Sequence, residues 1–186
     1  MPKLPSLKEE GTLFDLFQLF PGHVQTLMPF VDSVLRGPGE WDIAERELIA
    51  AYVSSLNACT FCLGGHVLYA QAFGIPEDQL AATLDDPNSA GLDKKLAATL
   101  GYVRHLNTMP HRLTQKDMDA VLNEGVSEKA LYEAIMIAGL FNMMNRIAEG
   151  NGVTFDARQD PTRHGLSGME NPRDHRFVTV KKAETA

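Results

Sequence analysis

Four residues whose side chains can carry out thiol chemistry lie within one short segment of the chain. Cys59 and Cys62 form a Cys-x-x-Cys pair and are the only cysteines, and His66 follows the second by four residues. Glu47 lies twelve residues before the first cysteine, inside an otherwise apolar run. A thiolate attacks peroxides and disulfides, and an imidazole can accept the proton that the thiol loses. A carboxylate can orient that imidazole, so the four residues are typical of a nucleophile, a base and an orienting group.

Two helices have to bring these residues together. Apolar spacing predicts one helix over residues 42–56 and a second over residues 59–73, separated by a short break. The first cysteine then lies in the first turn of the second helix, where exposed amide groups lower the pKa of a thiol. Cys62 and His66 lie on one face of that helix, one turn apart. A tight turn between the helices would bring Glu47 beside the imidazole.

Two local patterns support this arrangement. Asp42 followed by Glu45 has the spacing of a capping box, which favours a helix start at this point. Gly64 and Gly65 lie between the second cysteine and the histidine. Because each glycine in a helix costs roughly 1 kcal/mol relative to alanine, the pair indicates close approach of a ligand or a packed helix to the backbone.

Each part of the cluster also has a plain structural interpretation. A lone Cys-x-x-Cys pair occurs by chance or as half of a zinc site, and a lone histidine on a helix is more often a hydrogen-bonded structural group. Glu47 could lie at the exposed end of its helix, paired with Arg46 or Arg146. The four residues in one segment are therefore much more specific than any one of them.

Zinc binding and thioredoxin chemistry are the main alternatives for the cysteine pair. All four residues could ligate zinc, but structural zinc usually takes a second ligand pair from a distant segment. A thioredoxin-type dithiol needs a strand before the motif, within a βαβ unit. The sequence offers neither feature, so both alternatives are disfavoured.

The composition is that of a single globular domain without a nucleic-acid partner. The chain has 186 residues, of which 44% are hydrophobic and 22% are charged, and its formal net charge is -7. A nucleic-acid binder would carry a basic face, and no basic run is present. No segment has the ~18 consecutive apolar residues of a membrane span or the apolar stretch of a signal peptide. We therefore expect a cytoplasmic protein, in which a close cysteine pair is redox-active or metal-binding.

Helical spacing recurs along most of the chain, whereas sustained alternation of polar and apolar residues does not occur. The predicted fold is all-α, with about seven or eight helices in one domain. Residues 1–12 are interpreted as an extended arm, residues 13–155 as the helical domain and residues 156–186 as a polar tail. A helix over residues 127–149 is apolar all round in its middle and is expected at the buried centre of the bundle.

The polar tail is expected to wrap around the domain or to extend from it. A short strand is considered at residues 177–180. His164 and His175 lie in the tail, and no ligating or hydrogen-bonding residues gather around them in the sequence. Asn142, Asn145 and Arg146 are polar residues on the long helix, and we interpret them as interhelical hydrogen-bonding groups with a secondary role in lining the site.

The motif in which Glu47 precedes Cys59-x-x-Cys62-x-x-x-His66 by eleven intervening residues resembles the AhpD-like alkylhydroperoxidase family. This family belongs to the carboxymuconolactone decarboxylase superfamily, and the resemblance covers roughly residues 25–155. The run Phe-Asn-Met-Met-Asn-Arg-Ile-Ala at residues 141–148 resembles the peroxidase-related branch. The resemblance implies that Cys62 is the peroxidatic cysteine, that Cys59 resolves it, and that Glu47 and His66 relay the proton.

Other properties are also implied by this resemblance. It implies no metal, haem or flavin, recycling by an external dithiol, and a homo-oligomer that is a trimer or hexamer. The apolar segment at residues 13–20 and the tail are candidate interface elements. Phe61, just before the second cysteine, departs from the polar residue often found there, which implies a shorter relay or a more apolar substrate pocket.

The sequence thus predicts a thiol peroxidase that reduces hydrogen peroxide or organic hydroperoxides. One alternative is a decarboxylase or lactone-processing enzyme that uses His66 and Glu47 as acid and base. Another is a non-enzymatic, redox-sensing oligomer whose disulfide switches assembly.

Overall fold

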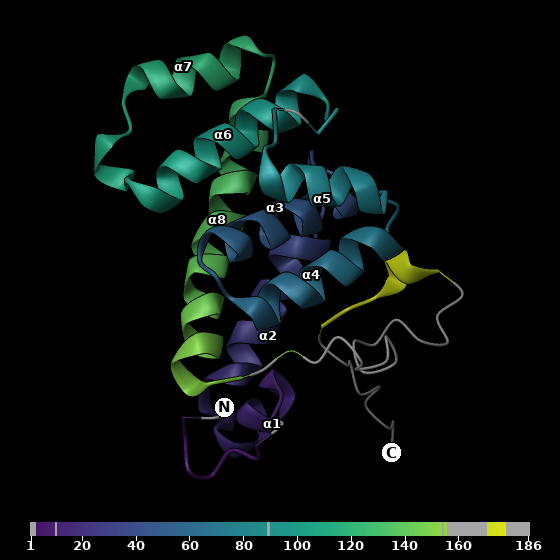
Figure 1. Cartoon of the computed structure of the whole chain (residues 1–186), viewed down its shortest axis with the longest axis vertical. Coiled ribbons are helices and arrows are strands. Elements are labelled where there is room, and N and C mark those ends of the chain that lie inside the picture. Colours follow the sequence, from purple (N-terminus) through teal and green to yellow (C-terminus); the bar gives the residue numbers. More distant parts are fainter. Residues whose placement is uncertain (1–2, 10, 89, 154, 156–170, 178–186) are drawn as a thin grey trace, which may run out of the picture.

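The fold was determined from a computed structural model that describes residues 3–9, 11–88, 90–153, 155 and 171–177. Over these ranges the chain forms eight α-helices and three short 3-10 helices, and no strand (Figure 1). The α-helices are α1 (Leu13–Leu19), α2 (Val24–Arg36), α3 (Ile43–Leu56), α4 (Thr60–Ala72), α5 (Glu77–Asp85), α6 (Lys94–Thr108), α7 (Gln115–Asn123) and α8 (Glu128–Asn151). The predicted all-α fold is confirmed.

The junction between α3 and α4 shapes the site. Asp42 caps α3 through the predicted capping box, in which its backbone N–H donates to Glu45 Oε2 at 2.8 Å. The helix ends at Leu56, with Asn57 as its C-cap, and Ala58 has a φ of 53°, the only positive φ of a non-glycine residue among those described. A left-handed alanine costs roughly 1–2 kcal/mol. This residue turns the chain sharply, and α4 packs back along α3 (Figure 1).

Helix α3 is the most deeply buried element of the bundle. Its residues 46–54 are all buried, and it packs against α2, α4, α5, α6 and α8. The middle of the long helix α8, residues 134–141, was expected at the buried centre, and most of its side chains, Ala134, Ile137 and Phe141 among them, are buried. Beyond this stretch one side of the helix faces solvent, with Met143 41% exposed.

The N-terminal residues pack on the bundle. The backbone N–H of Lys3 donates to Asn151 O at the end of α8, at 3.1 Å. The backbone here makes turns, because Leu7 N–H donates to Leu4 O and Gly11 N–H donates to Lys8 O. Leu7 is buried as a result, and its side chain joins an apolar cluster beneath the start of α4.

The described part of the tail lies against α2, α3 and α4. It contains a 3-10 helix at Pro172–Asp174 and ends at Phe177. The predicted strand at residues 177–180 therefore falls almost wholly outside the described residues, as does His164. In the part of the chain that is described, no helix combines the length and apolar character needed to cross a membrane.

Candidate active site

The cysteine pair lies at the N-terminus of α4. Cys59 is the N-cap residue and Cys62 follows in the first turn, and both are buried free thiols. Their side chains pack with Leu7, Leu16 and Val153 in an apolar cluster. The predicted position of the dithiol at a helix start is thus observed.

The two thiols are hydrogen-bonded to each other. This contact lowers the pKa of Cys59, because the Cys62 thiol donates to it, and the effect outweighs the burial that would raise the pKa. The same contact, together with burial, raises the pKa of Cys62 well above its usual range. The dithiol therefore holds its first negative charge mainly on Cys59, and the two groups titrate as a pair.

One stripe of α8 runs along the reactive face of α4. The His66 ring packs edge-on to Phe141, with ring centroids 4.4 Å apart and an interplanar angle of 83°. One turn further along α8, the side chain of Asn145 is hydrogen-bonded to Cys62 and opposes the rise of its pKa. Glu149 follows by another turn and acts on Cys59, where its charge raises the pKa. Helix α8 thus supplies a different partner to His66, Cys62 and Cys59.

Buried and partly buried amide side chains hold this stripe in place. Asn145 Oδ1 accepts from Asn57 Nδ2 at 2.8 Å, and Asn145 Nδ2 donates to Ser54 Oγ at 3.0 Å. Asn142 Nδ2 donates to Asn107 Oδ1 at 2.6 Å, and Asn107 Nδ2 donates to Asn57 Oδ1 at 2.9 Å. The predicted interhelical hydrogen bonds of Asn142 and Asn145 are therefore present, and they tie α8 to the turn that precedes the dithiol.

Glu47 and His66 are in direct contact. The fully buried carboxylate of Glu47 accepts a hydrogen bond from His66 Nδ1 through Oε2. Its other oxygen, Oε1, forms an ion pair with Arg36 Nη2 at 2.5 Å. Burial alone would raise the pKa of Glu47, but the interactions of this carboxylate with His66 and Arg36 outweigh burial and hold the pKa below the usual value.

Arg36 is a site residue that the sequence interpretation missed. The alternative partners suggested for Glu47 were Arg46 and Arg146, and neither contacts it. Arg46 donates instead to the backbone carbonyls of Trp41 and Gly37, at 2.9 and 2.6 Å. Adjacent residues on a helix point in different directions, which excludes a pair between positions 46 and 47.

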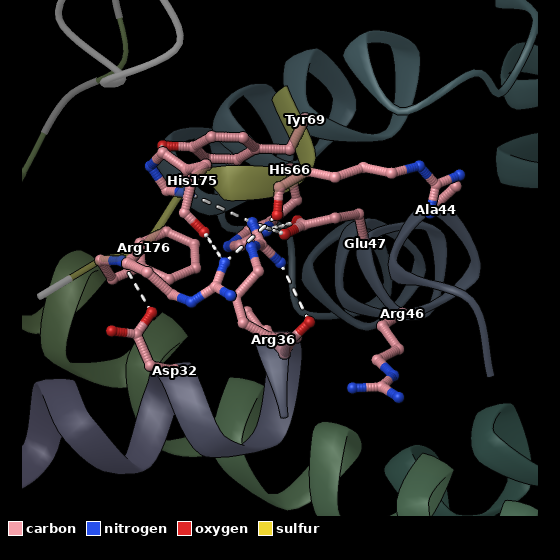
Figure 2. A network of polar contacts seen from close by, with 12 residues as sticks. Asp32, Arg36, Ala44, Arg46, Glu47, His66, Tyr69, His175 and Arg176 are labelled. Carbon is pink, nitrogen blue, oxygen red and sulfur yellow. Dashed lines mark hydrogen bonds and ion pairs between the residues drawn. The ribbon is translucent and has the colours of Figure 1, made fainter. Parts of the chain in front are cut away.

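His175 is a second missed residue, and the expectation that it lacks gathered partners was wrong. It is 3% exposed, with Nδ1 3.5 Å from Arg36 Nη2 and Nε2 3.3 Å from the Tyr69 hydroxyl. Figure 2 shows these side chains converging with Glu47 and His66 from α2, α3, α4 and the C-terminal segment. No local signal marks His175, because all of its partners named here lie more than 100 residues away in the sequence.

The site therefore has two parts that meet along α4. Cys59 and Cys62 are packed in the apolar cluster, whereas His66 is bonded to Glu47 on the neighbouring face. No contact among the described side chains joins Cys62 to His66, although one helical turn places their Cβ atoms roughly 5–6 Å apart. Within the described ranges, no three His, Cys, Asp or Glu side chains converge as a metal site would require.

The four motif residues and Arg36 all lie in a segment that matches a known family. Residues 21–105 match the model of the carboxymuconolactone decarboxylase family. The resemblance to this superfamily is confirmed. No curated protein matches the chain significantly by sequence.

Solved structures share the AhpD-like fold. An uncharacterised peroxidase-related protein from Ralstonia eutropha JMP134, described as an alkylhydroperoxidase AhpD core, is 18% identical with a TM-score of 0.73, covering 83% of this chain and 78% of that one. A peroxidase-related protein from Silicibacter sp. TM1040 is 19% identical with a TM-score of 0.72, covering 78% of this chain and 76% of that one. A protein of unknown function from Agrobacterium tumefaciens is 19% identical with a TM-score of 0.69, covering 78% and 98%.

The carboxymuconolactone decarboxylase match ends within α6, so α8 and His175 lie outside it. The position at which this chain departs from the AhpD-like pattern, Phe61, is partly buried against the cluster of the dithiol. Its ring adds apolar cover there and offers no group to a proton relay.

The glycine pair in α4 also has an observed neighbour. A Cβ added at Gly64 would lie 2.4 Å from the ring of Phe155, which follows α8. The predicted close approach to the backbone is thus made by an aromatic side chain of the same chain.

Proposed function

We propose that this protein is a thiol peroxidase that reduces hydrogen peroxide or organic hydroperoxides through the Cys59/Cys62 pair. Glu47 and His66 serve as its proton relay. The observation that carries the proposal is a reduced, buried dithiol in the first turn of α4, with a carboxylate-bonded imidazole one turn further along. The peroxidase-related solved structures share the fold, which is consistent with this chemistry.

The relay begins with His66. Because Nδ1 is bonded to Glu47, Nε2 carries the lone pair and can accept the first proton of the dithiol. The remaining charge is shared by the two sulfurs, and moving the proton across their hydrogen bond leaves the thiolate on Cys62. The thiolate attacks the terminal oxygen of the hydroperoxide and the O–O bond breaks. Cys62 becomes a sulfenic acid, and the departing alkoxide takes the proton from His66 to form an alcohol.

Resolution uses the second thiol. The sulfur of Cys59 attacks the sulfenic acid of Cys62, the S–S bond forms, and the hydroxyl leaves with the Cys59 proton as water. The protein has then lost two electrons, and an external dithiol restores both thiols by exchange. We propose this external dithiol as the reductant, and we also propose that the protein is a homo-oligomer located in the cytoplasm.

The assignment of attack to Cys62 rests on its neighbours. It lies one turn from His66, and the amide of Asn145 beside it can stabilise a thiolate. The lowered pKa of Cys59 favours the reverse order. A test must therefore distinguish the two sulfurs.

Peroxide consumption should be measured with a dithiol donor for the wild type, Cys62→Ser and Cys59→Ser. Cys62→Ser should abolish turnover, whereas Cys59→Ser should allow one equivalent of peroxide to react and leave a sulfenic acid on Cys62, detected by trapping and mass spectrometry. Wild-type turnover by Cys62→Ser would refute thiol peroxidase chemistry at this site. A trapped sulfenic acid on Cys59 in Cys62→Ser would reverse the roles of the two cysteines.

A second candidate is an acid–base enzyme of the wider superfamily, such as a decarboxylase or lactone-processing enzyme. It is favoured by one observation: the assembly of Arg36, Glu47 and His66 is complete without any contact to the thiols. Activity on such a substrate that survives alkylation of both cysteines would support this alternative.

A further inference from the structure

Arg36 brings a permanent positive charge into the protein interior. Its side chain is 1% exposed, and that of Glu47 is 0% exposed. The guanidinium carbon lies 4.8 Å from the ring centroid of Phe177, 4.9 Å from that of Phe73 and 5.6 Å from that of Tyr69. A guanidinium keeps its charge throughout the pH range in which proteins fold, so this cation is a fixed element of the site.

The charge of Arg36 affects what His66 can do. A buried carboxylate needs a positive partner, because an unpaired charge in the interior is strongly unfavourable. If Glu47 contacted His66 alone, the imidazole would have to carry a proton to supply that partner. Arg36 already supplies it at Oε1, so Oε2 needs only a neutral N–H donor. An imidazole that is already charged cannot act as a base.

We propose that Arg36 is a positioning residue that neutralises Glu47 and thereby keeps the His66 ring uncharged, with Nε2 available to accept a proton. The charge assignment stands on the geometry of the three residues. Its consequence for catalysis rests on the thiol peroxidase function proposed above.

The C-terminal segment 171–177 completes this arrangement. His175 faces Arg36 through a ring nitrogen, and the ring of Phe177 covers the guanidinium. Arg173 anchors the segment to Asp42 through Nη1 and Nη2, at 2.8 and 3.2 Å. The segment therefore keeps the guanidinium out of water, where its charge acts more strongly on Glu47.

Other charged or titratable groups lie near the ring. The Tyr69 hydroxyl from α4 and the imidazole of His175 face the same space, and burial raises the pKa of Tyr69 well above its usual range, so that this hydroxyl stays neutral. Asp32 on α2 is bonded to the backbone N–H of Phe177 at 2.7 Å. Phe141 and Phe177 also make ring contacts with His66 and bring no charge.

The test is nuclear magnetic resonance of full-length protein with 15N-labelled histidine, titrated between pH 5 and 9. The His66 signals are assigned from a His66→Gln sample. In the wild type at neutral pH, His66 should show the neutral ring protonated at Nδ1. In Arg36→Met, the Glu47–His66 pair should keep one more proton up to a pH higher by at least about one unit, because a neighbouring positive charge has been removed.

A matched control separates charge from packing. Arg46 is also buried and helical but does not contact Glu47, so Arg46→Met should leave the His66 titration as in the wild type. Arg36→Lys retains the charge and should resemble the wild type. A charged His66 ring in the wild type at neutral pH, or a folded Arg36→Met with an unchanged titration, would overturn the proposal. The wild-type spectrum decides the matter even if Arg36→Met does not fold.

A second measurement follows the consequence for catalysis. The pH at which the thiols reach half of their maximal alkylation rate should rise in Arg36→Met and not in Arg46→Met. If peroxide is not consumed by the wild type while the histidine titration behaves as described, the peroxidase function fails and the role of Arg36 stands. If peroxide turnover is normal in both variants at every pH, the role of Arg36 in catalysis fails and the peroxidase function stands.

Discussion

The thiol of Cys62 donates a hydrogen bond to the sulfur of Cys59, so that each cysteine shifts the pKa of the other in an opposite direction. This relationship gives the dithiol a direct experimental signature.

Replacing one cysteine should change the acidity of the other. In Cys62→Ala the pKa of Cys59 should rise, because its main stabilising donor is lost while burial remains, and alkylation of Cys59 at pH 7 should slow. In Cys59→Ala the pKa of Cys62 should fall, because the partner that raises it is gone. Alkylation rates measured against pH by mass spectrometry would check both. Shifts of the same sign in the two variants would contradict the hydrogen-bonded pair.

Glu47→Gln should be strongly destabilising. The amide leaves Arg36 buried without a counter-charge, and breaking a buried ion pair in this way costs about 3–5 kcal/mol. Urea unfolding should show this loss, and the double variant with Arg36→Met should recover part of it, because the unpaired charge is removed too. An additive double variant would argue against the ion pair.

The same carboxylate should make stability depend on acid pH. Because the folded-state pKa of Glu47 lies below its ordinary value of 4.5, its contribution to stability is present above that value and is lost as the pH falls through the folded-state pKa. Urea midpoints measured between pH 6 and 3 should therefore fall less steeply in Glu47→Gln than in the wild type. Equal slopes would indicate that Glu47 is not held ionised.

Gly64→Ala should destabilise the protein because the new methyl group would collide with Phe155. Overpacking of this kind typically costs about 1–3 kcal/mol, and Phe155→Ala in the same chain should relieve it. Gly139 on α8 is the matched control, since a Cβ there meets nothing within 4 Å. Gly139→Ala should raise the thermal midpoint slightly through the unfolded state. A neutral Gly64→Ala would show that the ring does not hold this position.

His175→Ala should loosen the C-terminal segment. The substitution removes a buried ring that contacts Arg36 and Tyr69, and we expect a loss of about 1–3 kcal/mol. Hydrogen exchange should accelerate more at residues 171–177 than in α3. His111→Ala, an exposed histidine in the 3-10 helix Pro110–Arg112, should change neither quantity.

Local sequence signals predicted the helices well. The capping box at Asp42 and the break after residue 56 each act within a few residues. The placement of Cys62 and His66 on one face of α4 follows from helical spacing alone.

Long-range partners could not be predicted in this way. Arg36 looked like an ordinary last-turn arginine beside a Gly-Pro-Gly loop, and its burial depends on how α2 docks on α3. His175 looked like a tail residue, and only the folded chain brings it to Arg36. The stripe of α8 along α4 depends on the relative register of two helices that are separated by three others.

The sharp turn at Ala58 has a consequence for how the site forms during folding. Glu47, both cysteines and His66 belong to one helical hairpin, so their loop-closure entropy is small and their contacts are local. Arg36 lies on the preceding helix, whereas His175 lies beyond α8 and is synthesised after it. We therefore expect a growing chain to present its two thiols before the segment at 171–177 can close over the guanidinium. The reactive groups of this protein are assembled early, and the residues that set their charge are among the last to arrive.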